Sequence, residues 1–191
     1  MANISILGTG SMGQAIGGLV AKGGNTVQQL NTSNAAEAVT GDIVILAVPH
    51  SALAGIVATR GAELAGKVVV DITNPLDFAT FDDLTVPADG SAAAELAREL
   101  PQSRVVKAFN TNFAGTLATG SVGSETTAVL IAGDDADAKA AVSSFVEAAG
   151  LRAIDAGSLK RARELESLAF LQMTLAAGEK LSWTGGFAAV A

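Results

Sequence analysis

Six residues near the N-terminus, Gly8-Thr9-Gly10-Ser11-Met12-Gly13, have the spacing Gly-x-Gly-x-x-Gly. The apolar run Asn3–Leu7 precedes them, and a helical pattern over Gly13–Lys22 follows. In this context the glycines permit a tight turn and a close approach of phosphate to the backbone, and the helix N-terminus adds N–H donors with a partial positive charge. We therefore predict that the pyrophosphate of a nicotinamide dinucleotide binds at Gly8, Thr9, Gly10, Ser11, Met12 and Gly13.

The segment after the second apolar run should contact the adenosine ribose. A carboxylate at this place is typical of NAD sites, and a basic residue accommodates the 2′-phosphate of NADP. The stretch Gln28–Ser33 has neither, and ends in Asn31, Thr32 and Ser33. These neutral donors favour NADP, with NAD as the alternative, although the same residue types also occur in ordinary turns.

Further candidates follow other apolar runs, at the places where cofactor clefts open in α/β sheets. His50 follows Val48-Pro49 and is a candidate to bond a ribose or donate a proton, with loop packing as the alternative. Asn74 and Asn110 follow two neighbouring runs and are candidates to bond a carboxamide or a substrate, with turn capping as the alternative.

Strand-like and helix-like stretches alternate along the chain. The predicted strands are Asn3–Leu7, Thr26–Leu30, Ile43–Val48, Lys67–Ile72, Val105–Phe109, Ala128–Ala132 and Arg152–Asp155. The predicted helices are Gly13–Lys22, Ser51–Leu64, Ser91–Leu100, Ala136–Ala149 and Lys160–Ser182. This order predicts an α/β fold of the Rossmann type, with a doubly wound, mostly parallel sheet and helices on both faces. We expect one domain over residues 1–191, with a C-terminal helical extension over about 158–191, and no full helix between Leu30 and Ile43.

Composition excludes several classes of function. Acidic residues outnumber basic ones by 19 to 12, so the net charge of −7 gives no general attraction for nucleic acid or anionic membranes. The chain has no Cys and one His, which excludes thiolate catalysis, disulfides and a multi-histidine metal site. No signal peptide or membrane span is recognisable. We expect a soluble, cytoplasmic protein whose partners are small-molecule cofactors, without metal, nucleic acid or membrane.

The C-terminal third carries a charged run and an apolar helix. The run Lys160–Glu166 alternates in charge, which is typical of a solvated helix face, with a subunit contact or the binding of an anionic substrate tail as the alternatives. The stretch Leu165–Leu175 is apolar around most of its circumference, which favours a homodimer interface on this helix. The following segment, Trp183–Phe187, contains the single Trp of the chain and is expected to cover a cleft or contact the partner subunit.

Several short motifs occur together in an order that resembles one family, the NADP oxidoreductases that use the deazaflavin coenzyme F420. These motifs are Gly8–Gly13, Ala47–Pro49, Val70–Leu76, Lys107–Thr111, Ala132–Asp135, Asp155–Gly157 and Arg163–Glu166. The resemblance implies that Thr9–Met12 holds the pyrophosphate and Asn31–Ser33 the adenosine phosphate. It also implies that Val48, Pro49, Thr73, Asn74, Pro75 and Ala108 line the cleft toward the nicotinamide. The cofactor-binding candidates further include Ala47, His50 and Asn110.

In that family hydride passes directly between the nicotinamide and the deazaflavin, so the resemblance implies no catalytic acid, base or nucleophile. The expected cofactors are NADP, or NAD, and F420 or a flavin as second substrate. Two other functions stay open. One is an NADPH-dependent reductase of a small carbonyl or imine, for which Lys107 is the one candidate proton donor. The other is a non-catalytic NADP(H)-binding sensor.

Overall fold

The computed structural model describes residues 1–190 of the chain. The strands of its main sheet are β1 (Asn3–Leu7), β2 (Thr26–Leu30), β3 (Ile43–Leu46), β4 (Val68–Asp71), β5 (Arg104–Lys107), β8 (Ala128–Gly133) and β9 (Arg152–Gly157). A separate hairpin is formed by β6 (Ser121–Val122) and β7 (Glu125–Thr126). The helices are α1 (Ser11–Lys22), α2 (Leu53–Leu64), α3 (Ala92–Glu99), α4 (Ala114–Thr119), α5 (Ala136–Ala148) and α6 (Ala162–Ala177).

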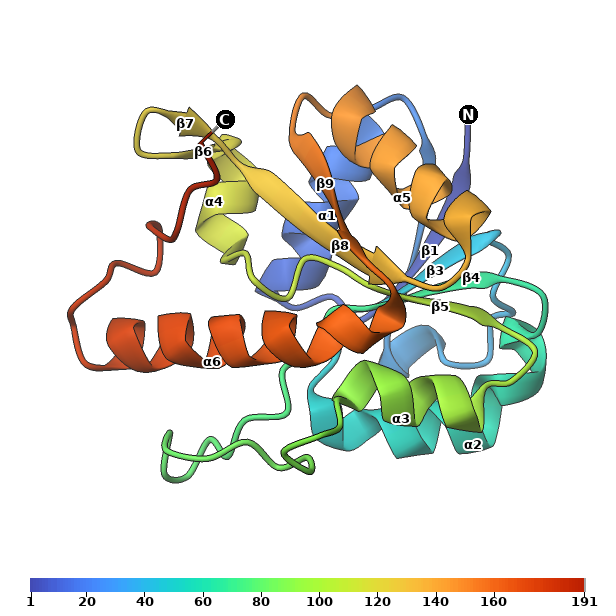
Figure 1. Cartoon of the computed structure of the whole chain (residues 1–191). Coiled ribbons are helices and arrows are strands. Elements are labelled where there is room, and N and C mark those ends of the chain that lie inside the picture. The colour runs from blue at the N-terminus through green and yellow to red at the C-terminus, as the bar shows by residue number, and fades with distance from the viewer. Residues whose placement is uncertain (191) are drawn as a thin grey trace.

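The main sheet has the strand order β2-β1-β3-β4-β5-β8-β9 and is parallel except for the pair β5 and β8. The chain moves from β1 outward to β2 and then returns to the other side of β1 to form β3. This reversal makes a topological switch point, where ligands of such sheets bind outside the carboxyl ends of the strands. The predicted α/β, Rossmann-type, doubly wound sheet is confirmed (Figure 1).

Two apolar layers enclose the sheet because its central strands alternate their side chains between the faces. Ile43 and Ile45 pack with α1 and α5 on one face, whereas Val44 and Leu46 pack with α2 and α3 on the other. Figure 1 shows α1 and α5 on one side of the sheet and α2 and α3 on the opposite side. The sheet is therefore covered on both faces, which leaves its strand ends for function.

The connection between β2 and β3 contains only a 3-10 turn, Thr32–Asn34, as the shortness of the segment predicts. Sequence patterns missed α4 and the β6–β7 hairpin, which are too short to show a periodicity. The prediction of a helix over Lys160–Ser182 was wrong at its end. The helix α6 stops at Ala177, where the backbone N–H of Gly178 caps the Thr174 carbonyl and Glu179 turns to a φ of 58°.

Beyond α6 the chain continues as a tail that folds back along the molecule, toward the β6–β7 hairpin (Figure 1). The Gln172 carboxamide accepts the backbone N–H of Phe187 at 3.3 Å, and Arg152 donates to the Ala189 carbonyl at 2.6 Å. Trp183 lies against Phe113, with ring centroids 5.0 Å apart. These contacts place the tail at the edge of the sheet where the parallel strands β1 to β5 have their carboxyl ends. Within the described residues, no helix is long and apolar enough to cross a membrane.

Candidate functional site

The glycine loop connects β1 to α1 at the switch point. Gly8 has a φ of +114°, and a Cβ there would overlap the Ala47 carbonyl oxygen. A Cβ at Gly13 would overlap the Gly8 carbonyl oxygen, so both positions need glycine for close packing. Gly10 differs, because a Cβ there would meet no atom within 4 Å. The space above Gly10 is therefore open, while the loop below it is packed tightly.

Backbone hydrogen bonds fix this loop between neighbouring strands. The N–H of Gly8 donates to the Leu30 carbonyl at 2.8 Å, and the N–H of Ala47 donates to the Leu7 carbonyl at 2.8 Å. Gly10 is the N-cap of α1 and provides no side chain to accept from the first helical turn. The first N–H groups of a helix have no partner within the helix. The loop thus presents free donors and a partial positive charge to the open space above Gly10.

A cavity of about 390 Å³ lies on the β2 side of the loop. Its lining contains the predicted residues Gly8, Asn31, Thr32 and Val48. Ser33 is not in the lining, and its hydroxyl and its backbone N–H both donate to Oδ1 of Asn31. The lining also contains the N-cap of α2, Ala52, and four residues of α2, Gly55, Ile56, Thr59 and Arg60, none of which was predicted. They share one face of that helix by their spacing.

A second cavity, of about 440 Å³, lies on the other side of the loop. The predicted residues Ser11, Met12, Asn74 and Asn110 line it. Trp183 and Thr184 also line it, and they belong to the segment that was expected to cover a cleft or contact the partner subunit. The residues that were not predicted are Ile72, Phe109, Asn112, Phe113, Ala114, Gly115 and Met173. None of these side chains is acidic or basic, and none carries a thiol. The cavity thus joins aromatic and thioether surfaces with neutral amide and hydroxyl groups.

The amide groups of this second cavity are held in fixed orientations. Asn110 donates through Nδ2 to Asn74 Oδ1 at 3.0 Å and to the Leu165 carbonyl at 3.0 Å. The Nδ2 of Asn74 returns a bond to the Asn110 carbonyl at 2.9 Å. Within the described part of the chain, the buried oxygens Oδ1 of Asn110 and Asn112 accept no hydrogen bond. A ligand that carries N–H donors would satisfy them.

Phe109 directs Asn110 toward this cavity. Its φ of 62° lies in the left-handed region, which a bulky residue adopts only when its surroundings enforce it. The ring is fully buried and stacks on Phe145, with centroids 5.9 Å apart. The turn after β5 is therefore held by packing, and Asn110 follows it directly.

Beneath the cavity lies a buried ion cluster. Lys107 Nζ is 2.9 Å from Asp71 Oδ2 and 2.7 Å from Glu166 Oε1, and all three side chains are sealed from solvent. It also donates to the Thr73 carbonyl at 2.6 Å, and Glu166 accepts the backbone N–H of Ala92 at 2.9 Å. The prediction that the run Lys160–Glu166 is a solvated face was wrong for Glu166, because this carboxylate compensates a buried ammonium group.

Several predicted residues line neither cavity. Ala47 packs under Gly8, Thr73 and Pro75 are buried, Ala108 is fully buried, and Pro49 is exposed. His50 lies in a separate hollow between α2 and α3, beside Glu95 and Glu99. Thr9 contributes its carbonyl oxygen, which accepts from the Gln14 carboxamide at 3.0 Å. Among the described residues, no group of three or more His, Cys, Asp and Glu side chains could hold a metal ion.

Similar proteins point to one family. A sequence profile described as "NADP oxidoreductase coenzyme F420-dependent" matches residues 24–75. The F420-dependent NADP reductase of Methanocaldococcus jannaschii is 34% identical over 149 residues, which cover 76% of this chain and 66% of that protein. The protein of the same name from Methanothermobacter marburgensis is 36% identical over 154 residues, covering 75% and 66%. The chain thus spans about two thirds of the length of these curated relatives.

A solved structure extends the similarity to the full length. A protein of Arthrobacter sp. FB24, assigned as an F420-dependent NADP reductase, has a TM-score of 0.86 at 26% identity, with all of both chains covered. The profile match, the two curated relatives and this structure agree with the motifs and with the sheet topology. The chain belongs to the family of coenzyme F420-dependent NADP oxidoreductases.

Proposed function

We propose that the protein binds NADP(H) across its two cavities and transfers hydride directly between the nicotinamide and coenzyme F420 or a related flavin. The relatives with this name cover most of the chain, which supports the pairing of NADP with F420. The observation that carries the proposal is the lining of the second cavity. It offers flat apolar surfaces and neutral amides, but no acid or base.

The loop lies between the two cavities and defines how a dinucleotide would lie. Gly8 lines the first cavity, whereas Ser11 and Met12 line the second. A molecule that occupies both must therefore cross the open space above Gly10, where the helix N-terminus favours a pyrophosphate. The adenosine would then lie along α2 and beside Asn31 and Thr32. The nicotinamide would enter the second cavity.

The residues of the second cavity would bind and orient the reacting rings. The free Oδ1 of Asn110 fits the carboxamide N–H groups of a nicotinamide. Phe113 and Trp183 offer aromatic faces for a second planar ring and exclude water from it. When bound, the cofactor pair supplies the hydride donor and acceptor, so the protein contributes positioning and desolvation. The reduced acceptor also takes up one proton, which would come from solvent, so no side chain has to donate it.

A reductase of small carbonyls or imines has less support. Such a reaction requires a proton donor near the substrate. The one candidate, Lys107, is fully buried and is held by Asp71, Glu166 and the Thr73 carbonyl. Its ammonium group does not line the second cavity. A non-catalytic sensor would bind NADP(H) without turnover of any acceptor.

We also propose that the protein forms a homodimer through α6 and the tail. Large apolar side chains remain exposed on these segments, including Leu171 at 52%, Phe187 at 51% and Val190 at 75%. Large apolar side chains that stay exposed in this way favour an interaction site. A symmetric pair of α6 helices would bury it against its own copy.

The test is a comparison of acceptors. Purified protein is mixed with NADPH and with F420, FMN or a panel of small carbonyls and imines, and the loss of nicotinamide absorbance is followed. The proposal expects turnover with F420, or with the flavin, and none with the panel. Turnover of carbonyls or imines alone would contradict it, and NADPH binding without any turnover would support the sensor.

A further inference from the structure

One basic side chain, Arg60, lines the cavity on the adenosine side. It comes from α2, whereas a base for the 2′-phosphate was sought after β2, where none exists. The lining residues Ala52, Gly55, Ile56, Thr59 and Arg60 follow a spacing of three and four, so Arg60 ends the cavity-facing side of the helix. The same cavity contains Gly8 at its other end and Asn31 and Thr32 beside it. A cation therefore lies where neutral groups alone were expected.

The guanidinium group is held firmly against the segment between β2 and β3. Its side chain is only 11% exposed. Nη1 donates to the Glu37 carbonyl at 3.0 Å and lies 3.3 Å from Glu63 Oε2, and Nη2 donates to the Ala35 carbonyl. These contacts use both N–H groups of Nη1 and one of Nη2. Among the described residues, Nε–H and the second N–H of Nη2 have no acceptor.

Two free N–H groups on a fixed guanidinium suit an oxyanion. Arginine binds phosphate in this way, through paired N–H donors that stay charged at every physiological pH. Asn31 and Thr32 line the same cavity and can add neutral bonds. Glu63 opposes this, because its carboxylate lies against Nη1 and also accepts the backbone N–H of Val39 at 2.8 Å. The cavity lining thus contains one cation, Arg60, whose charge is partly compensated by the carboxylate of Glu63 outside that lining.

We propose that Arg60 binds the 2′-phosphate of NADP(H) and sets the preference over NAD(H), and that Glu63 limits that preference. This inference rests on the proposed function, since it assigns the adenosine end of the dinucleotide to the first cavity. The competing interpretation is that Arg60 only clamps the segment 31–39. A clamp supports the binding of both cofactors, whereas a phosphate ligand acts on NADP alone.

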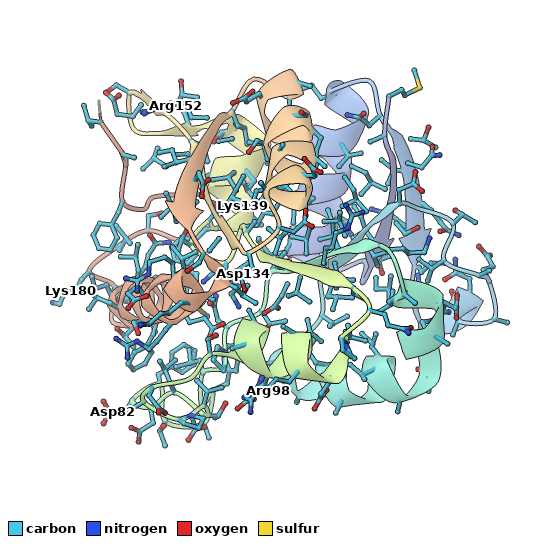
Figure 2. All side chains as sticks on the ribbon, turned by 45° about the vertical axis from the view of Figure 1, so that its right-hand side comes forward. Asp82, Arg98, Asp134, Lys139, Arg152 and Lys180 are labelled. Atoms are coloured by element: carbon cyan, nitrogen blue, oxygen red, sulfur yellow. The ribbon has the colours of Figure 1, made fainter. Side chains whose placement is uncertain are left out.

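The experiment is calorimetric titration with NADP⁺, NAD⁺, adenosine 2′,5′-bisphosphate and 5′-AMP. The variants are Arg60→Met, which keeps the apolar stem without the charge, and Glu63→Gln, which keeps an acceptor for Val39. The control is Arg98→Met, whose exposed side chain lies on α3, outside both cavities (Figure 2). Circular dichroism verifies that each variant is folded.

Arg60→Met should weaken the binding of NADP⁺ and of the 2′,5′-bisphosphate by roughly 10- to 100-fold, the range for a lost charged hydrogen bond. The dissociation constants of NAD⁺ and 5′-AMP should stay within about twofold of the wild-type values. Glu63→Gln should strengthen NADP⁺ binding, and Arg98→Met should change neither cofactor. Equal losses for NADP⁺ and NAD⁺ in Arg60→Met would overturn the inference alone. A wild-type protein that binds neither dinucleotide would overturn the proposed function as well.

Discussion

The ammonium group of Lys107 lies 2.7 Å from Glu166 Oε1, and both side chains are sealed from solvent. This contact joins β5 to α6, and the bond from Lys107 to Asp71 extends it to β4. The strands β4 and β5 precede Asn74 and Asn110, and α6 carries Met173. The cluster therefore connects three of the elements that form the second cavity. Its role in this account is to position them, not to exchange protons with a substrate.

Lys107→Met should destabilise the protein by about 3–5 kcal/mol, because it leaves two buried carboxylates without their cation. The free energy of unfolding is measured by urea denaturation. The control is Lys139→Met, which removes a partner of Asp155, a carboxylate with 60% side-chain exposure whose pKa is lowered by its bond to Lys139. Because Asp155 remains hydrated without its partner, this pair should contribute less than about 1 kcal/mol. Similar losses in the two variants would contradict the view that burial makes the cluster important.

Gly8→Ala should lower the stability of the fold, whereas Gly10→Ala should lower the affinity for NADP⁺. At Gly8 the left-handed φ and the Ala47 carbonyl oxygen exclude a Cβ, so alanine should destabilise the fold by several kcal/mol, on the order of 3. Gly10 has a φ of −70° and open space, so alanine there should change stability by less than about 1 kcal/mol. Its methyl group would occupy the space proposed for the pyrophosphate. Gly10→Ala should therefore weaken NADP⁺ binding while thermal unfolding is unchanged, and unimpaired binding would contradict the assigned cradle.

Trp183 should report on occupation of the second cavity by its fluorescence. It is the single Trp of the chain, and it packs on Phe113 in the cavity lining. F420 or FMN that enters the cavity should quench the emission with a saturable dependence on concentration. Trp183→Phe should keep turnover within about threefold, and Trp183→Ala should raise the KM for the acceptor by about tenfold or more, through lost aromatic contact. If the protein reduces an acceptor that leaves the Trp183 emission unchanged, the acceptor binds outside the second cavity and the assignment is contradicted.

Leu171→Glu should convert a dimer to a monomer. Leu171 lies on α6 with half of its surface exposed, so a charge there is harmless to the core but would be buried between two copies. Light scattering after gel filtration gives the mass. Ser144→Glu, at an exposed position of α5 and outside the proposed interface, is the matched control for added charge. A wild-type protein that is monomeric at all concentrations would contradict the proposed interface.

Local sequence patterns were sufficient for the features that depend on neighbours along the chain. The spacing of Gly8, Gly10 and Gly13 predicted the strand–loop–helix unit, and the apolar runs predicted the seven strands of the main sheet. Helix ends were harder, because the stop at Ala177 depends on the backbone turn at Gly178 and Glu179.

The residues that sequence reasoning missed depend on contacts between distant segments. In the sequence, Glu166 is one more charge in an alternating run. Its burial is explained by the contact with Lys107 on β5, which compensates its charge. Arg60 lies on α2 and donates to the carbonyls of Ala35 and Glu37, which lie 25 and 23 residues earlier in the chain. Its one available signal was the helical spacing with Ala52 and Ile56, which places it on the same face. Phe113 and Met173 line the second cavity as well, although they lie 60 residues apart in the sequence.

The most direct test of direct hydride transfer is a label experiment. NADPH deuterated in turn at each of the two hydride positions of its nicotinamide ring is oxidised by F420 with the purified protein. Because a deazaflavin accepts hydride on carbon, the transferred label does not exchange with water. Mass spectrometry should find deuterium in the reduced F420 from one of the two labelled cofactors and not from the other. Loss of the label to water from both, with F420 nevertheless reduced, would contradict the account.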